Sequence, residues 1–142
     1  MENLTAKAST VIEAPAGRVW RALVTPETIK RYMFGATVVA DWKVGGSIAW
    51  RGEWKGKPYE DKGEIVRFEP EHQLRYTHWS PLSGTPDTPE NRHMVTVDLE
   101  GEGARTRVSL SQDGNHSEEE RAHSEANWNK TLGDLKRIVE ST

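Results

Sequence analysis

The 142-residue chain contains no cysteine, and this absence excludes disulfide bonds, thiolate metal sites and cysteine nucleophiles. It also has no run of five like charges, and its formal net charge is only −3, so the basic surface of a nucleic-acid-binding protein is missing. No apolar stretch approaches the length of a membrane-spanning helix. Residues 1–10 lack the apolar core of a signal peptide, and we therefore expect a cytoplasmic protein.

Motifs of the common enzyme classes are equally scarce. None of the serines sits in a Gly-x-Ser-x-Gly elbow, and Gly45–Gly46 predicts a hairpin turn rather than a phosphate-binding loop. His116 and His123 lie seven residues apart, which matches no established metal motif, so we assign them to a solvated helix face. We therefore expect neither a metal nor a cofactor.

Alternating polar and apolar residues dominate the chain and predict mostly strands, with helical spacing near the two ends. Thr25 before Pro26 predicts the capping residue of a short helix. The elements expected in order are a strand at 5–12, a helix from Pro15, a short helix from Pro26, strands at 37–40, 47–54, 59–68, 74–79, 95–99 and 106–110, and a helix from Ser117. Short turns between consecutive strands require antiparallel pairing, and we predict one two-layer α+β domain over residues 1–142.

The last predicted helix has an apolar stripe over only part of its length. Ser117 and Glu120 predict a capping box at its start. Its stripe is Trp128, Leu132, Leu135 and Val139. Continued backward, the stripe reaches Ser124 or Glu125 and then Arg121, none of which is a large apolar residue. This predicts either a gap between helix and sheet that forms a ligand pocket, or an end of the helix that overhangs into solvent.

The same elements carry a resemblance to a known superfamily. The residues concerned are Ile12-Glu13-Ala14-Pro15, Val19-Trp20-Arg21-Ala22-Leu23, Thr25-Pro26, Asp41 with Val44-Gly45-Gly46, Gly63-Glu64-Ile65-Val66, Pro70, Leu74-Arg75-Tyr76-Thr77, Asn127-Trp128 and the Leu132 and Leu135 end of the helix. With them, residues 5–140 resemble the Bet v 1-like (START-like, SRPBCC) superfamily. Within it, the chain is similar to the family related to the C-terminal domain of the Hsp90 ATPase activator Aha1.

This resemblance implies a helix-grip fold, in which a curved antiparallel sheet of about seven strands wraps a long C-terminal helix, with two short helices after the first strand. Members of the superfamily include ligand carriers and stress-response proteins. Two positions depart from the family pattern, because His78 stands where tryptophan is common and Asn127 where glycine is common. A co-chaperone role does not carry over, since the resemblance covers one domain only.

We first expect the chain to bind a small apolar or aromatic molecule between sheet and helix. Such a carrier needs an internal cavity of about 300 Å³ or more that reaches solvent. Residues expected to line it are Trp50, Trp54, Tyr76, His78, His93 and Trp128, with Tyr32 and Phe34 gating the entrance. The loop at 80–90 either lines the mouth of the cavity or is a mobile solvent loop.

Two alternatives stay open. In the first, His78 and His93 act as acid and base in an enzyme related to cyclases or hydrolases of aromatic or polyketide-like substrates, although no carboxylate at fixed spacing supports them. In the second, Arg75, Thr77 and Trp79 form an exposed patch on the outer face of the sheet that contacts Hsp90. The sequence also leaves a homodimer open.

Overall fold

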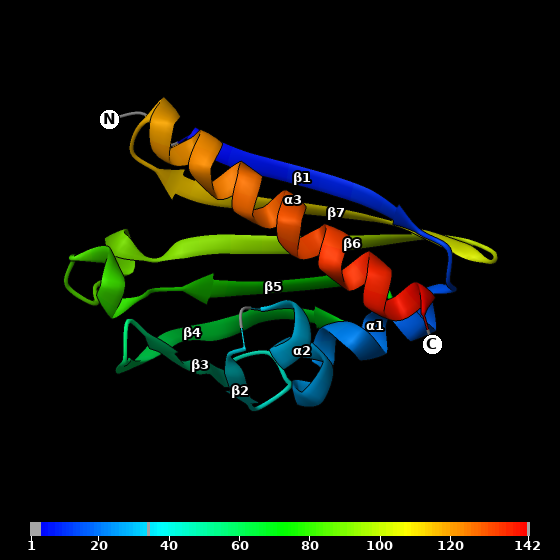
Figure 1. The fold of residues 1–142 in the computed structure, drawn as a ribbon, viewed down its shortest axis with the longest axis horizontal. Helices are drawn as coiled ribbons and strands as arrows, with labels where there is room; N and C mark the ends of the chain where they lie inside the picture. The colour runs from blue at the N-terminus through cyan, green and yellow to red at the C-terminus, as the bar shows by residue number, and fades with distance from the viewer. Residues whose placement is uncertain (1–3, 34, 142) are drawn as a thin grey trace.

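The computed structural model describes residues 4–33 and 35–141. It shows a single antiparallel sheet with the strand order β1-β7-β6-β5-β4-β3-β2 and a long helix crossing one face (Figure 1). The elements are β1 (Leu4–Ile12), α1 (Ala16–Val24), α2 (Pro26–Tyr32), β2 (Thr37–Ala40), β3 (Ser47–Trp54), β4 (Lys57–Glu69), β5 (Gln73–His78), β6 (His93–Glu102), β7 (Arg105–Asn115) and α3 (Glu118–Glu140). The helix-grip α+β fold that the sequence predicted is confirmed.

The inner face of the sheet is the apolar face of each strand. Val95, Val97 and Leu99 of β6 alternate with more exposed residues and are buried, as expected for a sheet with one face on the core. Gly45 turns the chain between β2 and β3 with φ +85°, and Gly63 lies so close to the Thr77 carbonyl that a Cβ would approach it to 1.7 Å. Gly45 therefore permits the turn of the β2–β3 hairpin, and Gly63 permits the close approach of β4 and β5.

The two short helices form where expected, but the cap differs in detail. Pro15 precedes α1, and Thr25 occupies the N-cap position of α2. The Thr25 hydroxyl does not cap α2, which corrects the expectation from the sequence, because it donates instead to the Arg21 carbonyl of α1 at 2.5 Å. Thr25 thus joins the two helices at their corner.

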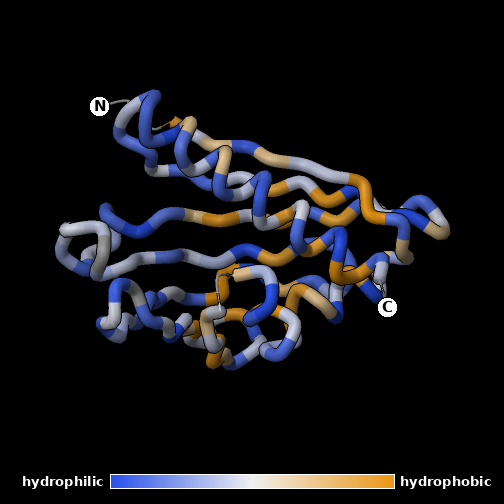
Figure 2. Tube along the Cα trace, viewed as in Figure 1, coloured by the Kyte–Doolittle hydropathy of each residue, from blue (hydrophilic) through white to orange (hydrophobic). Residues whose placement is uncertain are grey.

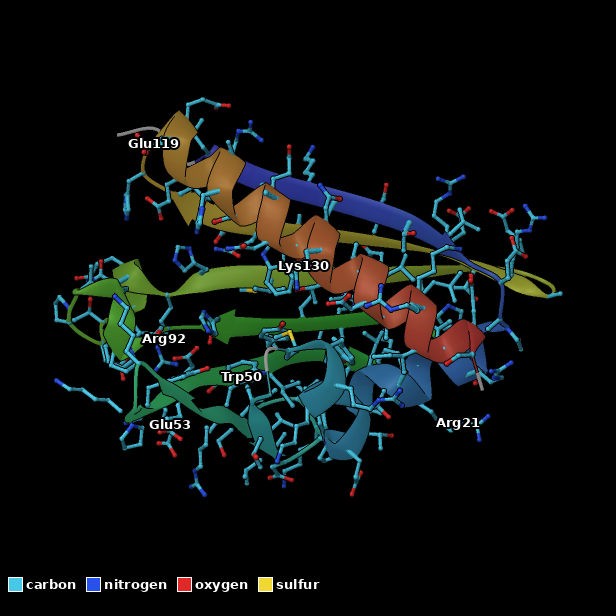
Figure 3. The ribbon with its side chains drawn as sticks, in the orientation of Figure 1. Arg21, Trp50, Glu53, Arg92, Glu119 and Lys130 are labelled. Atoms are coloured by element: carbon cyan, nitrogen blue, oxygen red, sulfur yellow. The ribbon has the colours of Figure 1, made fainter. Side chains whose placement is uncertain are left out.

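The long helix begins as predicted at Ser117, whose Oγ accepts a hydrogen bond from Glu120 N–H at 3.1 Å. In a full capping box the Glu120 carboxylate would accept from the backbone N–H of Ser117. Here it accepts instead from His116 N–H at 3.1 Å. Figure 2 shows hydrophilic colouring along the first turns of α3, and charged residues such as Glu119 and Lys130 lie on its outer surface (Figure 3). Among the described residues, no helix is both long and apolar enough to cross a bilayer.

Side chains of α3 also bond to the outer edge of β1, which is one of the two edges of the sheet. Two glutamates accept from backbone N–H groups, one within this strand and one just after its last residue, and one lysine donates to a backbone carbonyl of the strand. The three bonds are Lys7 N–H to Glu125 Oε1 at 3.1 Å, Glu13 N–H to Glu140 Oε2 at 2.8 Å and Lys136 Nζ to Val11 O at 2.6 Å. They hold the helix in register with the strand along most of its length.

Candidate ligand-binding site

A cavity of about 270 Å³, which we call the chamber, lies between the inner face of the sheet and the N-terminal half of α3. Its size is close to the lower end of the range for small-molecule sites. The residues that line it are Met33, Ala36, Trp50, Tyr59, Asp61, Tyr76, His78, His93, Val95, Gln112, Ser124, Asn127, Trp128 and Thr131. The expected gap between helix and sheet is therefore present, and it is walled by both aromatic and polar side chains.

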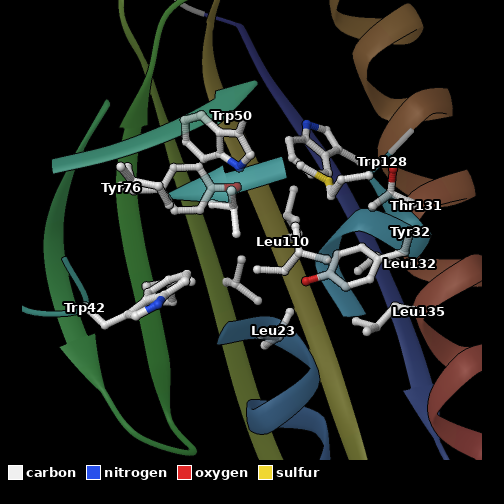
Figure 4. Close-up of a pocket in the computed structure, with 16 residues that line it drawn as sticks. Leu23, Tyr32, Trp42, Trp50, Tyr76, Leu110, Trp128, Thr131, Leu132 and Leu135 are labelled. Atoms are coloured by element: carbon white, nitrogen blue, oxygen red, sulfur yellow. The ribbon is translucent and has the colours of Figure 1, made fainter. Parts of the chain in front are cut away.

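A second, narrow cavity of about 40 Å³, which we call the extension, lies beside the chamber in the apolar core. Trp50, Tyr76 and Trp128 line both spaces. Figure 4 shows the Trp50 and Tyr76 rings facing side chains of α2 and α3 across this extension. Nearly all of its other wall residues are apolar, so it can accept part of a flat apolar group and little that is polar.

Three rings form the aromatic wall of the chamber, Trp50 from β3 and Tyr76 and His78 from β5, and the two strands flank β4. The Trp50 ring centroid lies 5.2 Å from that of Tyr76 and 5.1 Å from that of His78, the latter in an edge-on arrangement. Burial raises the pKa of Tyr76 well above its ordinary value of 10.0, so its hydroxyl remains a neutral hydrogen-bonding group. At the opposite end of the wall, burial and then the nearby Asp61 carboxylate raise the pKa of Tyr59.

His78 has a carboxylate partner that the sequence analysis did not find. Its Nε2–H donates to Asp61 Oδ2 at 2.9 Å, and the side chains are 29% and 16% exposed. The sequence showed no carboxylate at a fixed spacing from the histidines, and the tertiary structure supplies one for His78. Alternation in β4 places Asp61 on the same face as Tyr59, but only the pairing of β4 with β5 brings it to His78.

His93 faces His78 across β5 and β6, where the two are paired in register. Its Nδ1–H donates to the Asp113 carbonyl at 2.7 Å. Because a carbonyl can only accept, this bond fixes the hydrogen on Nδ1 and leaves Nε2 of the neutral ring as an acceptor. Gly114 has φ +76° beside this ring, and a Cβ there would approach His93 Nδ1 to 2.8 Å.

Polar bonds hold the N-terminal half of α3 above the sheet. Ser124 Oγ–H donates to Asn115 Oδ1 at 3.0 Å, and the Trp128 indole N–H donates to Gln112 Oε1. Asn115 is fully buried, and its amide also donates to the carbonyls of Leu4 and Gln112 at 3.0 and 3.1 Å. This half of the helix is thus spaced from the sheet by side-chain bonds, and the chamber occupies the space.

Five of the residues expected from the sequence, Trp50, Tyr76, His78, His93 and Trp128, lie together around the chamber. Tyr32 does not lie at the entrance: it is buried beside the narrow extension, and its hydroxyl donates to the Ala22 carbonyl at 3.2 Å. Phe34 and the side chain of Trp54 lie outside the described part of the chain. The sequence analysis missed Trp42 in the extension, and Asp61, Tyr59, Gln112 and Thr131 in the chamber.

The loop at 80–90 does not line the chamber with any described side chain. It contains two short 3₁₀ turns, Pro81–Ser83 and Pro89–Asn91, and lies against the outer face, where Trp79 Nε1–H donates to the Thr85 carbonyl at 3.2 Å. Arg75, Thr77 and Trp79, which the sequence predicted to form an exposed patch, are partly exposed. Within residues 4–33 and 35–141, His, Asp and Glu side chains form no group of three suited to a metal ion.

Comparison with known proteins places this geometry in a wider context. The family model for Activator of Hsp90 ATPase homolog 1-like protein matches residues 13–140, whereas no curated protein matches the chain. The solution structure of ChR145 from Cytophaga hutchinsonii is 54% identical, with 99% of this chain and 97% of that chain covered and a TM-score of 0.87.

Two more distant structures share the fold. The Aha1 dimer from Colwellia psychrerythraea is 18% identical, with 96% of each chain covered and a TM-score of 0.75. DynU16, described as a protein in the dynemicin biosynthetic locus, is 20% identical over 96% of this chain and 47% of that chain, with a TM-score of 0.78.

Proposed function

Because this chain belongs to the family of Activator of Hsp90 ATPase homolog 1-like proteins, we propose that it binds a small, largely aromatic molecule in the chamber. The observation that carries the proposal is the combination in one space of about 270 Å³ of aromatic rings from the sheet and polar groups from β4, β6, β7 and α3. Concave sites of this composition are typical of small-molecule binding.

Apolar and polar residues line different parts of the site, and this distribution indicates how the ligand lies. A flat apolar part packs against Trp50 and Trp128 and extends toward the narrow apolar end. A polar part remains beside His78, His93 and Gln112 in the wider chamber. Apolar burial then contributes most of the affinity, and the polar groups select the orientation.

Native mass spectrometry of the protein purified from its own host tests the proposal directly. We expect an additional mass that denaturation removes. The matched variants are Asn127→Trp, at an exposed position of α3 that borders the chamber, and Asn129→Trp, at an exposed position that borders a different groove. The first should obstruct the chamber and lose the bound mass, and the second should keep it; a bound mass that survives in both variants contradicts the proposed site.

A second candidate is an enzyme acting on an aromatic or polyketide-like substrate, as a cyclase or hydrolase. The bond between Asp61 and His78 favours it, since a carboxylate that orients an imidazole is a common feature of acid–base catalysis. In its support, one structure of the same fold comes from a protein of the dynemicin biosynthetic locus. The test is turnover of a panel of aryl esters and aromatic β-ketothioesters: His78→Gln should abolish turnover while the bound mass remains, and equal turnover in this variant excludes the role.

Four further properties are also proposals. A relative of the same fold is named as an Aha1 dimer, so we propose that this chain forms a homodimer, which light scattering after size exclusion would measure. Contact with Hsp90 is proposed from the family description alone, and a pull-down with purified Hsp90 tests it. We also propose a cytoplasmic location and a link to stress, to be tested by cell fractionation and by protein levels after heat shock.

A further inference from the structure

We infer that the chamber selects an aromatic amine, bound as a cation, and rejects aromatic carboxylates and fatty acids of similar shape. This inference rests on the proposed function and adds the charge class of the ligand. The observation behind it is the set of charged and hydrogen-bonding groups on the chamber wall. The apolar part of the site alone would not distinguish these classes.

The formal charges on the wall are of one sign. Asp61 is a carboxylate, while none of the described residues that line the chamber is lysine or arginine. Two basic residues next to lining residues in sequence, Lys62 of β4 and Arg92 just before β6, do not belong to this wall. A ligand carboxylate would therefore be buried with no cation to pair with it, which is a costly arrangement in a protein interior.

Two hydrogen-bond acceptors of the polar end of the chamber bear on the ligand class, one on Asp61 and one on His93. Asp61 Oδ2 accepts from His78, but its second oxygen, Oδ1, is buried and has no hydrogen-bond partner among the described residues. The neutral His93 ring offers Nε2 as an acceptor, since its Nδ1–H is used by the Asp113 carbonyl. A ligand N–H donor could pair with His93 Nε2, and a ligand cation in the chamber would be attracted by the Asp61 carboxylate, whose buried Oδ1 has no hydrogen-bond partner among the described residues.

The aromatic wall favours the same class of ligand. An ammonium group near the face of an indole or phenol ring is attracted by the negative face of the ring, and the attraction grows when water is excluded. Trp50, Tyr76 and Trp128 all contribute to the chamber, and Trp50 is only 5% exposed. A cation between these rings and Asp61 would receive both interactions at once.

Three probes with the same ring system and different charge test the inference on the full chain. They are 2-naphthylmethylamine, 2-naphthylmethanol and 2-naphthoate, measured by isothermal titration calorimetry at about pH 8, where the amine carries its proton and the carboxylic acid is ionised. We expect the amine to bind about tenfold more tightly than the alcohol, and the carboxylate to bind at least about tenfold more weakly than the alcohol.

Two variants locate the origin of the preference. Asp61→Asn removes the charge with little change in shape, and it should bring the amine to within about threefold of the alcohol, while the carboxylate remains the weakest ligand because the wall still offers it no cation. Glu60→Gln is the matched control: Glu60 is the preceding residue of β4, does not line the chamber, and accepts from Arg51 at 2.6 Å. It should keep the full order of affinities, and the thermal unfolding of both variants shows whether they are folded.

Each outcome decides the inference separately from the proposed function. If the naphthoate binds as tightly as the amine, or if Asp61→Asn leaves the preference for the amine over the alcohol unchanged, the charge preference is refuted while ligand binding in the chamber stands. If no probe binds but a bound mass of another class is found in the native protein, the amine class is wrong and the chamber remains a site. If no probe binds and no bound mass exists, both proposals fail.

Discussion

The two halves of α3 meet the sheet in different ways. In the C-terminal half, Leu132, Leu135 and Val139 are buried and leave little space beneath the helix. In the N-terminal half, Ser124 and Trp128 bond to polar side chains of β7, and the chamber lies beside them. The comparison teaches that apolar contact closes the gap between two layers, whereas a few directed hydrogen bonds can hold the layers apart at a fixed distance.

The closed half should respond most strongly to truncation. Leu135 is fully buried, and Leu135→Ala should lower the free energy of unfolding by about 3 kcal/mol, because it removes buried methyl groups and leaves a cavity. Urea unfolding followed by circular dichroism measures this. Ser124→Ala, which removes one hydroxyl in the open half, is the comparison and should cost about 1 kcal/mol. Equal losses in the two variants would abolish the distinction between the halves.

The open half should depend on its polar bonds. Asn115→Ala removes the partner of Ser124 and of the Leu4 and Gln112 carbonyls, and we expect a loss of about 2 kcal/mol in the free energy of unfolding, since buried polar groups are left unsatisfied. Hydrogen exchange should rise along β1 and the start of α3 and stay unchanged at Leu132 and beyond. Asn129→Ala, at an exposed position, should change stability by less than about 0.5 kcal/mol. Uniform exchange changes along the helix would argue against a separate open half.

The start of α3 supplies a smaller effect of the same kind. Ser117→Ala removes the oxygen that accepts from Glu120 N–H, and it should lower the free energy of unfolding by about 1 kcal/mol. Ser117→Asp restores an acceptor and should regain most of the loss. If Ser117→Ala proved neutral in urea unfolding, the first turn of the open half would be held by other contacts.

The end of α3 should give a modest pH dependence. A hydrogen bond from Glu13 N–H, and then the bond from Lys136, lower the pKa of Glu140 below its ordinary value of 4.5. A carboxyl whose folded pKa is lowered contributes stability that is complete above pH 4.5 and is lost as the pH falls through the folded pKa. The melting temperature of Glu140→Gln should therefore fall less than that of the wild type as the pH is lowered. An equal fall in the two proteins would contradict this assignment.

Local patterns were sufficient to predict the order of the elements and a two-layer α+β domain, whereas the helix-grip arrangement was implied by the family resemblance. Alternation marked β6 and β7, Gly45 marked the β2–β3 hairpin, and Ser117 marked the start of α3. Each of these signals is contained within a few residues, so it survives without knowledge of the tertiary structure. Even the unequal stripe of α3 correctly indicated that its two halves differ.

The site was harder to predict because its key contacts join distant residues. Asp61 reaches His78 only through the β4–β5 pairing, which is shifted between Ile65 and Arg67 by an irregularity that no local pattern marks. Tyr32 was expected at the entrance, but the corner between α1 and α2 places its hydroxyl on the Ala22 carbonyl. Strand parity showed which face a side chain occupies, and not how far along the sheet its partner lies.

The bonds from α3 to β1 bear on how this sheet meets other molecules. An exposed strand edge offers backbone groups that can pair with a strand of another chain. Glu125 and Lys136 already occupy two such groups on β1, and Glu140 occupies one just after it, while the opposite edge is β2, which is four residues long. A strand of another chain would have to displace the α3 side chains to pair with β1, or pair with only the four residues of β2 at the other edge. The sheet is thereby guarded against growing into larger aggregates.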